Sequence, residues 1–134
     1  MNMNASAITM ATNGNLTTSS CGKNSAIDHN PAAKLVNNTL MAANMAMADA
    51  ALNSGAALNI DRAALVELIK VSSGRSFAFD VRARLPEASA FTHGAALLSK
   101  DVGLLGAVLG ADEAFAPLRD AAQPFLDKIT KPKH

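Results

Sequence analysis

Aromatic residues and cysteine are scarce in this chain of 134 residues. It contains five Phe, no Trp, no Tyr and a single cysteine, Cys21. One cysteine excludes an internal disulfide and a zinc cluster built from cysteines, so a reducing compartment is the default expectation. Because aromatics are few, the hydrophobic 49% of the chain is carried by Ala, Leu, Val and Met. This composition favours helices over a β-sandwich.

Strong charge and long apolar runs are also missing. The formal net charge is +1, which gives no basic surface for nucleic acid. No apolar run approaches the ~18 residues of a membrane span, and the N-terminus does not resemble a secretory signal. The three histidines show no metal-ligand spacing, so no metal site is expected. We therefore predict a cytoplasmic protein of one domain at most, without a nucleic-acid or membrane partner.

The composition divides the chain into three parts. Residues 1–24 are rich in Asn, Thr, Ser and Ala without an apolar period, and we predict that they are disordered or peripheral. Residues 25–130 are predicted to form a helical domain, followed by a polar tail at 131–134. No strand pattern is found. The expected fold is an all-α bundle around one long central helix, without a Rossmann domain.

The long helix is predicted over residues 30–58. Asn30 suits an N-cap, and Pro31 suits the first helical position, where a missing N–H is harmless. No further proline and only one glycine, Gly55, follow before Leu58. Apolar residues occupy nearly all sides of this helix, which indicates burial on several sides. Either a partner chain or another domain covers part of it, or it is an ordinary central helix of a small bundle.

Four further helices are expected at 62–71, 76–85, 95–109 and 114–129. Asn59 suits the end of the long helix, and Asp61 can cap the next one. In the last helix, Pro117 and Pro124 are expected to produce shorter pieces. The residues expected to pack are Leu65, Leu68 and Ile69 in the second helix and Leu97, Leu98, Leu104, Leu105 and Val108 in the fourth.

Lys34 and Asn38 form the one polar pair that suggests chemistry. They lie four residues apart near the start of an otherwise apolar helix, and this spacing places them on one face. A lysine near a helix N-terminus is unfavourable for the helix dipole, so a purely structural lysine tends to avoid the position.

The motifs resemble those of the C-terminal helical domain of the β-hydroxyacid dehydrogenase family. This family includes the 3-hydroxyisobutyrate dehydrogenase and tartronate semialdehyde reductase types, whose domain is similar to that of 6-phosphogluconate dehydrogenase. The resemblance runs from about residue 25 to residue 125. The motifs that carry it, in chain order, are Lys34-Leu-Val-Asn-Asn38, an acid at Asp49, Asn59-Ile-Asp61, Ser72-Ser73-Gly74, Lys100-Asp101 and Pro117.

The resemblance implies an oxidoreductase that moves a hydride between NAD or NADP and a small 3-hydroxy acid or its semialdehyde. It implies that Lys34 is the catalytic general acid/base and that Asn38 holds the substrate. Ser72 and Ser73 correspond to a region that approaches the substrate. Lys100 corresponds to the lysine that reaches into the cofactor and substrate cleft.

Two departures from the family pattern leave an alternative open. Ser25, Asp28 and Asn30 stand where the family has glycines, and no Gly-x-Gly-x-x-Gly motif follows a strand. We therefore expect the cofactor domain to be missing from this chain. The expected partner is a second copy of the chain or a separate Rossmann-domain protein. The alternative is a non-catalytic helical module, derived from the family, that dimerises or binds a ligand.

Overall fold

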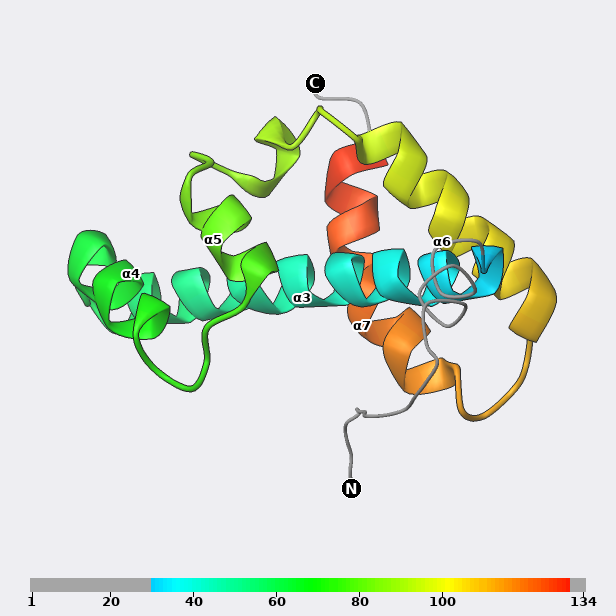
Figure 1. Ribbon diagram of the computed structural model, residues 1–134. Helices are drawn as coiled ribbons and strands as arrows, with labels where there is room; N and C mark the ends of the chain where they lie inside the picture. Colours follow the sequence, from blue (N-terminus) through cyan, green and yellow to red (C-terminus); the bar gives the residue numbers. More distant parts are fainter. Residues whose placement is uncertain (1–29, 131–134) are drawn as a thin grey trace, which may run out of the picture. The chain divides into compact units, whose positions relative to one another are not determined.

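The computed structural model describes residues 30–130, which form five α-helices and one short 3₁₀ helix, with no strand among them. In chain order these are α3 (Pro31–Ala57), α4 (Arg62–Lys70), α5 (Phe77–Ala83), η1 (Ala88–Ala90), α6 (Ala95–Leu109) and α7 (Ala116–Thr130) (Figure 1). The all-α prediction is confirmed. The predictions for residues 1–24 and 131–134 lie outside the described residues, and none of the described helices is long and apolar enough to cross a membrane.

The chain divides into two compact units, residues 1–34 and residues 35–134. The described part of the first unit is the start of α3. Asn30 caps this helix as predicted, because its Oδ1 accepts hydrogen bonds from the backbone N–H of Ala32 at 3.0 Å and of Ala33 at 3.2 Å. At the other end, Asn59 has a positive φ of 59°, the left-handed conformation expected where a helix stops.

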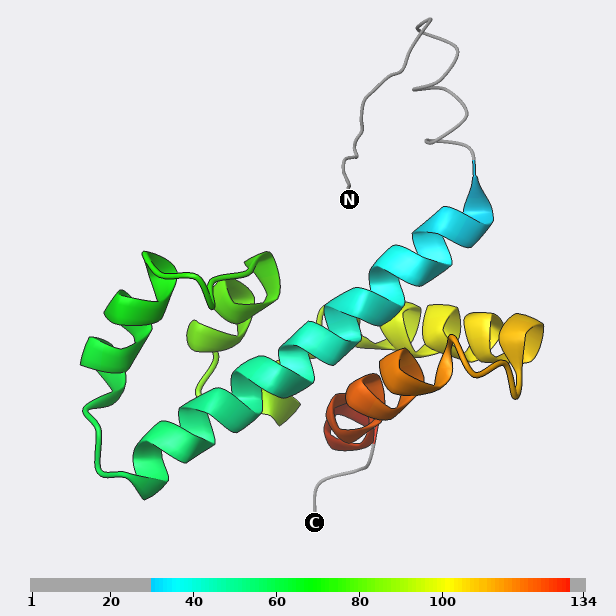
Figure 2. The ribbon, with the colours of Figure 1, turned by 90° about the horizontal axis from the view of Figure 1, so that it is seen from below.

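In the second unit, the remaining helices pack along α3. Figure 2 shows α4 and α5 on one side of α3 and α6 and α7 on the other. Two apolar clusters hold these helices together. The larger joins α3 mainly to α6 and α7 and also takes in Ala78 of α5 and Ala88 of η1; its other members include Ala42, Met45, Leu98, Val102, Ala122 and Phe125. The smaller joins α3 to α4 and α5 and includes Ala48, Leu52 and Phe79.

Alanine lets several elements approach α3 closely. Ala42, Ala43, Ala46 and Ala48 are all buried, and Met45 is completely inaccessible. The face left over carries Leu40 and Met47, which remain 48% and 53% exposed. The helix is therefore central to the bundle, as one of the two interpretations of its sequence expects, and residues 30–130 leave part of it uncovered. Its coverage by a partner chain or another domain stays a prediction.

Polar side chains cap the starts of the two short helices; the cap by Asp61 was predicted, whereas Ser76 was predicted only as the first residue of its helix. Asp61 Oδ2 accepts from the backbone N–H of Ala64 at 3.0 Å, and Ser76 Oγ accepts from that of Phe79 at 2.9 Å. The predicted packing face of α4 is partly wrong. Leu65 and Ile69 contact the smaller cluster, but Leu68 is 61% exposed. α4 lies at the edge of the unit and buries no residue completely, so its third apolar side chain has nothing to contact.

The bounds of α6 agree with the prediction, whereas its packing set does not. Leu98 and Leu105 are buried, but Leu97, Leu104 and Val108 are exposed, and the buried Val102 was not predicted. The helix ends at Gly110, whose φ is 52°. Because apolar residues surround α6 on most sides, the sequence pattern alone does not select the buried face.

The prediction that prolines would divide the last helix is wrong. α7 is continuous from Ala116 to Thr130 with Pro124 inside it. Pro117 is the second residue, where a backbone N–H has no helical partner in any case. Pro124 has no backbone N–H, so the Asp120 carbonyl lacks its helical hydrogen-bond donor. Asp120 and Pro124 are exposed, so water can donate a hydrogen bond to that carbonyl. The buried Ala122, Phe125 and Leu126 hold both halves of α7 against the core.

Replacing the most deeply buried aromatic should weaken the fold strongly. Phe125 is 1% exposed and its ring lies 5.5 Å from that of Phe91. We expect Phe125→Ala to lower the free energy of unfolding by about 3–5 kcal/mol, measured by urea denaturation. Val108→Ala, at a side chain 74% exposed, is the control and should change it by less than about 0.5 kcal/mol. Equal effects of the two substitutions would contradict this description of the core.

Candidate functional site

Among the predicted site residues, Asn38 forms a side-chain hydrogen bond to a residue far away in the sequence. It lies half-buried on α3, and its Nδ2 donates a hydrogen bond to Oδ2 of Asp101 on α6 at 2.5 Å. Its Oδ1 accepts a weaker bond of 3.3 Å from Nδ2 of Asn37. The fold therefore places the Asn38 motif beside the Lys100-Asp101 motif, although 63 residues separate the two bonded side chains.

Asp101 and Lys100 differ sharply in their surroundings. Asp101 is 3% exposed, and Asn38 is its only hydrogen-bond partner among residues 30–130. Lys100 is exposed and forms no ion pair within the described part of the chain. α6 thus buries the Asp101 carboxylate against Asn38 and leaves the Lys100 amine exposed on the adjacent residue. The sequence pointed to this motif, but it did not indicate that Asp101 would bind Asn38.

Lys34 lies in the first turn of α3, and its side chain is exposed. It belongs to the first compact unit, and Asn38, four positions further along the helix, belongs to the second. Its backbone N–H bonds to the Asn30 carbonyl at 3.3 Å, which continues the helix from its cap. The role of Lys34 as general acid/base remains a prediction.

Ser72 and Ser73 follow the last turn of α4. Ser72 donates from Oγ to the Leu68 carbonyl, and its own carbonyl accepts from the backbone N–H of Arg75. Ser73 is exposed. These contacts end the helix, and no hydrogen bond within residues 30–130 joins either serine to Asn38 or Lys100. Their assignment to the substrate region also remains a prediction.

A hollow of about 370 Å³ lies beside Asn38, between α3 and the start of α5. Amides and apolar side chains line it, and none of its described lining residues carries a charge. The lining residues are Asn37, Asn38, Leu40, Met41, Asn44, Phe77 and Ala78. Phe77 is 75% exposed and can move without disturbing the core. The hollow can therefore accept a small, uncharged group.

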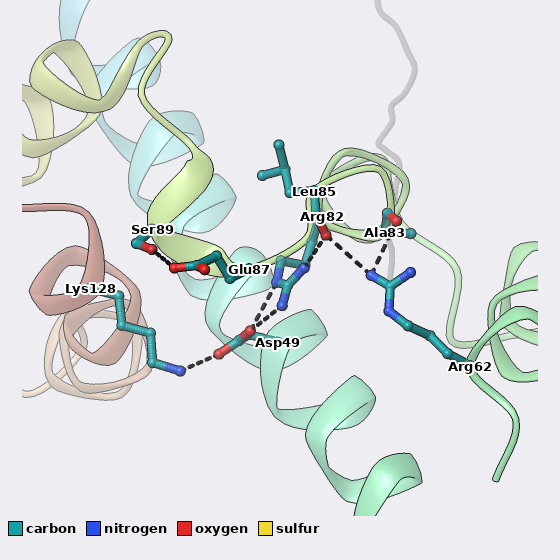
Figure 3. Close-up of polar contacts among 8 residues, drawn as sticks. All are labelled: Asp49, Arg62, Arg82, Ala83, Leu85, Glu87, Ser89 and Lys128. Atoms are coloured by element: carbon teal, nitrogen blue, oxygen red, sulfur yellow. Dashed lines mark hydrogen bonds and ion pairs between the residues drawn. The ribbon is translucent and has the colours of Figure 1, made fainter. Parts of the chain in front are cut away.

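A second polar centre lies deeper along α3, at Asp49 (Figure 3). Its Oδ1 accepts from Nε and Nη2 of Arg82 on α5, both at 2.8 Å, and its Oδ2 accepts from Nζ of Lys128 on α7. Asp49 and Arg82 are each 5% exposed, whereas the Lys128 side chain is about half exposed. One carboxylate thus joins three helices.

The C-terminal end of α5 extends this network. Arg82 donates from Nη1 to the Leu85 carbonyl at 2.9 Å, and Arg62 of α4 donates from Nη2 to the carbonyls of Ala83 and Leu85, both at 3.2 Å (Figure 3). Two guanidinium groups therefore satisfy carbonyls at a helix end, where positive charge is favourable. In the sequence, Asp49 stands out only as a family feature, and no motif indicated Arg82 or Lys128. A signal for pairing was available, because Asp49 is the one ionisable residue between residues 35 and 57.

Opposing effects act on the Asp49 carboxyl. Burial alone would raise its pKa, but the hydrogen bonds and charges of Lys128 and Arg82 lower it, and the pKa lies below its ordinary value. Asp49 therefore stays ionised and binds both cations. Within residues 30–130, no three His, Cys, Asp or Glu side chains gather as a metal site would require.

Comparison with known protein families identifies the family of this chain. A family model described as "NAD-binding of NADP-dependent 3-hydroxyisobutyrate dehydrogenase" matches residues 30–132. The chain belongs to this family. The resemblance stated from the motifs is confirmed, and with it an oxidoreductase family of the hydroxyacid dehydrogenase type. Comparisons with curated proteins and with solved structures gave no match.

The Asp49 centre should make stability depend on pH. A group whose folded pKa is depressed contributes stability above its unfolded pKa and loses that contribution as the pH falls through the folded pKa. We therefore expect the free energy of unfolding to fall from about pH 5 downward. At neutral pH, Asp49→Asn should cost about 3–5 kcal/mol because it leaves Arg82 buried without its counter-charge.

The matched control is Asp120→Asn, at an exposed ion pair with Arg119. It should change stability by less than about 1 kcal/mol. Urea titrations between pH 2.5 and 7 measure both effects. If Asp49→Asn and the unmodified chain lost stability in parallel as the pH fell, the acid dependence would not come from Asp49.

Proposed function

We propose that this chain acts as part of an NAD(P)-dependent dehydrogenase on a small 3-hydroxy acid or the matching carbonyl compound. The observation that supports this best is the 2.5 Å hydrogen bond between Asn38 and Asp101. It brings two motifs of the family together on neighbouring helices. The exposed amine of Lys100 adds a charged group on α6, next in sequence to Asp101, and the hollow beside Asn38 adds space for a ligand.

Each proposed residue has a chemical task. Lys34 accepts the hydroxyl proton during oxidation and returns it to the carbonyl oxygen during reduction, as a general base and acid. Asn38 holds the substrate by hydrogen bonds, because an amide offers both a donor and an acceptor. When bound, NAD(P) accepts or supplies the hydride.

The residues described here fit one end of such a cofactor. Lys100 offers an exposed cation, and the amides beside Asn38 offer hydrogen bonds for a polar ring substituent. A glycine-rich turn between a strand and a helix, the usual cradle for a pyrophosphate, does not occur among residues 30–130. We therefore propose that most of the cofactor is held by a Rossmann domain outside these residues, on this chain's partner or elsewhere.

Removal of the proposed acid/base should abolish turnover. In an assay that follows NADPH or NADH oxidation with a small semialdehyde, we expect Lys34→Ala to lower the rate by about 10²–10⁴-fold. Lys70→Ala, at another exposed lysine in α4, is the matched control and should leave the rate unchanged. Normal turnover in the Lys34 variant would refute its catalytic role. No turnover in the unmodified chain, even with NADPH or NADH well above the ~1 mM dissociation constant expected for weak binding, would favour the alternative below.

The alternative is a non-catalytic helical module that dimerises. The uncovered face of α3 favours it, because Asn37, Leu40, Asn44 and Met47 follow the alternating spacing of three and four residues that suits helix pairing. No ionised side chain is exposed on α3 between residues 35 and 57, so a second copy would meet no like-charge repulsion. Such a partner would also cover part of the hollow beside Asn38.

Sedimentation measures this alternative directly. If α3 pairs with a second copy, the chain should sediment as a dimer, and Met47→Glu should shift it toward monomer because a charge would be buried in the interface. Val71→Glu, at an apolar side chain 77% exposed beyond the end of α4, should leave the dimer intact. A monomeric unmodified chain at the same concentrations would rule the dimer out.

A further inference from the structure

We propose that Asp101 makes the Asn38 end of the site select an uncharged, hydroxyl-bearing group and reject a carboxylate. The inference rests on the proposed function, because it concerns which end of a hydroxy acid contacts Asn38. Three observations carry it: the bond between the two side chains, the burial of Asp101, and the lack of charged residues in the lining of the hollow, to which Asn38 contributes.

The bond fixes the orientation of the Asn38 amide. An ionised carboxylate can only accept hydrogen bonds, so the NH₂ group of Asn38 has to face Oδ2 of Asp101. In the flipped orientation, two acceptor oxygens would lie 2.5 Å apart. Asn37 supports the same orientation, since its Nδ2 donates to Oδ1 of Asn38. One N–H of Asn38 and the free lone pair of its Oδ1 remain for a ligand.

The charge of Asp101 limits what that ligand group can be. The structure gives Asp101 no cation within ion-pair distance among residues 30–130, and its carboxylate is almost fully buried. A carboxylate bound to the remaining N–H of Asn38 would lie within roughly 6 Å of it, where like charges disfavour each other. A hydroxyl carries no such penalty, and it can donate to Oδ1 or accept from the N–H.

The lining of the hollow agrees with this selection. Asn37, Asn38 and Asn44 provide amides, while Leu40, Met41 and Phe77 provide apolar surface. A carboxylate placed there would lose water without gaining a cation from the lining residues, whereas a hydroxymethyl group would satisfy both kinds of surface. The carboxylate of a hydroxy acid therefore has to lie outside the hollow. Asp101 is in this sense a positioning and specificity residue, because it acts through Asn38.

The test compares matched ligands on the 134-residue chain. NMR titrations with 3-hydroxypropionate, malonate and propionate present a hydroxyl, a second carboxylate or neither group at the same position. We expect 3-hydroxypropionate to bind about tenfold more tightly than malonate. Asp101→Asn removes the charge with little change in shape and should reduce that preference to about twofold or less, whereas Asp120→Asn should leave it unchanged. Equal binding of the two ligands by the unmodified chain would overturn the inference.

A second readout needs no ligand. The side-chain NH₂ resonances of Asn38 should shift in Asp101→Asn and stay in place in Asp120→Asn. If they did not shift, the Asn38–Asp101 contact would be absent and the inference wrong, even if the proposed function held. If they shifted but none of the three ligands bound, the contact would stand, and both the selectivity and the proposed substrate class would fail. Far-UV circular dichroism confirms that each variant is folded.

Discussion

A single buried carboxylate ties the helical unit together. Asp49, in the middle of α3, binds Arg82 of α5 and Lys128 of α7, and Arg82 also contacts the carbonyl of Leu85 that Arg62 of α4 reaches. Elements on both sides of the long helix are thus held by one ion-paired centre. Desolvating these charges is costly, so the centre adds less to net stability than the apolar clusters around it. Its main effect is to fix how the short helices sit on α3.

The rest of α3 is suited to the centre of the bundle because many of its side chains are small and, apart from Asp49, none between residues 35 and 57 is charged. Alanines at buried positions let α5, α6 and α7 approach closely, and Met45 fills the space between them. The same helix carries Asn38 near its start. The scaffold and the candidate site therefore share one rigid element, and the Asn38–Asp101 bond connects that element to α6 in the same unit.

Local signals predicted much of this fold. Asn30, Asn59 and Asp61 each mark a helix end through a backbone preference or a side-chain cap, which depends only on near neighbours. Features set by tertiary packing were not predictable. Leu68 and Leu97 are apolar yet exposed, and Pro124 lies inside a helix because the core holds both halves in place. In the site, the motifs identified Asn38 and Lys100, but the pairing of Asn38 with Asp101, and of Asp49 with Arg82 and Lys128, depends on contacts over 30 residues or more.

We propose that this chain supplies the residues that act on the substrate and that another domain holds most of the cofactor. A titration of the purified 134-residue chain with NADPH and NADH, by calorimetry or quenching of nucleotide fluorescence, tests it most directly. The account predicts a dissociation constant of about 1 mM or weaker for both nucleotides. Micromolar binding would contradict it, because the chain would then build a complete cofactor site without a Rossmann domain.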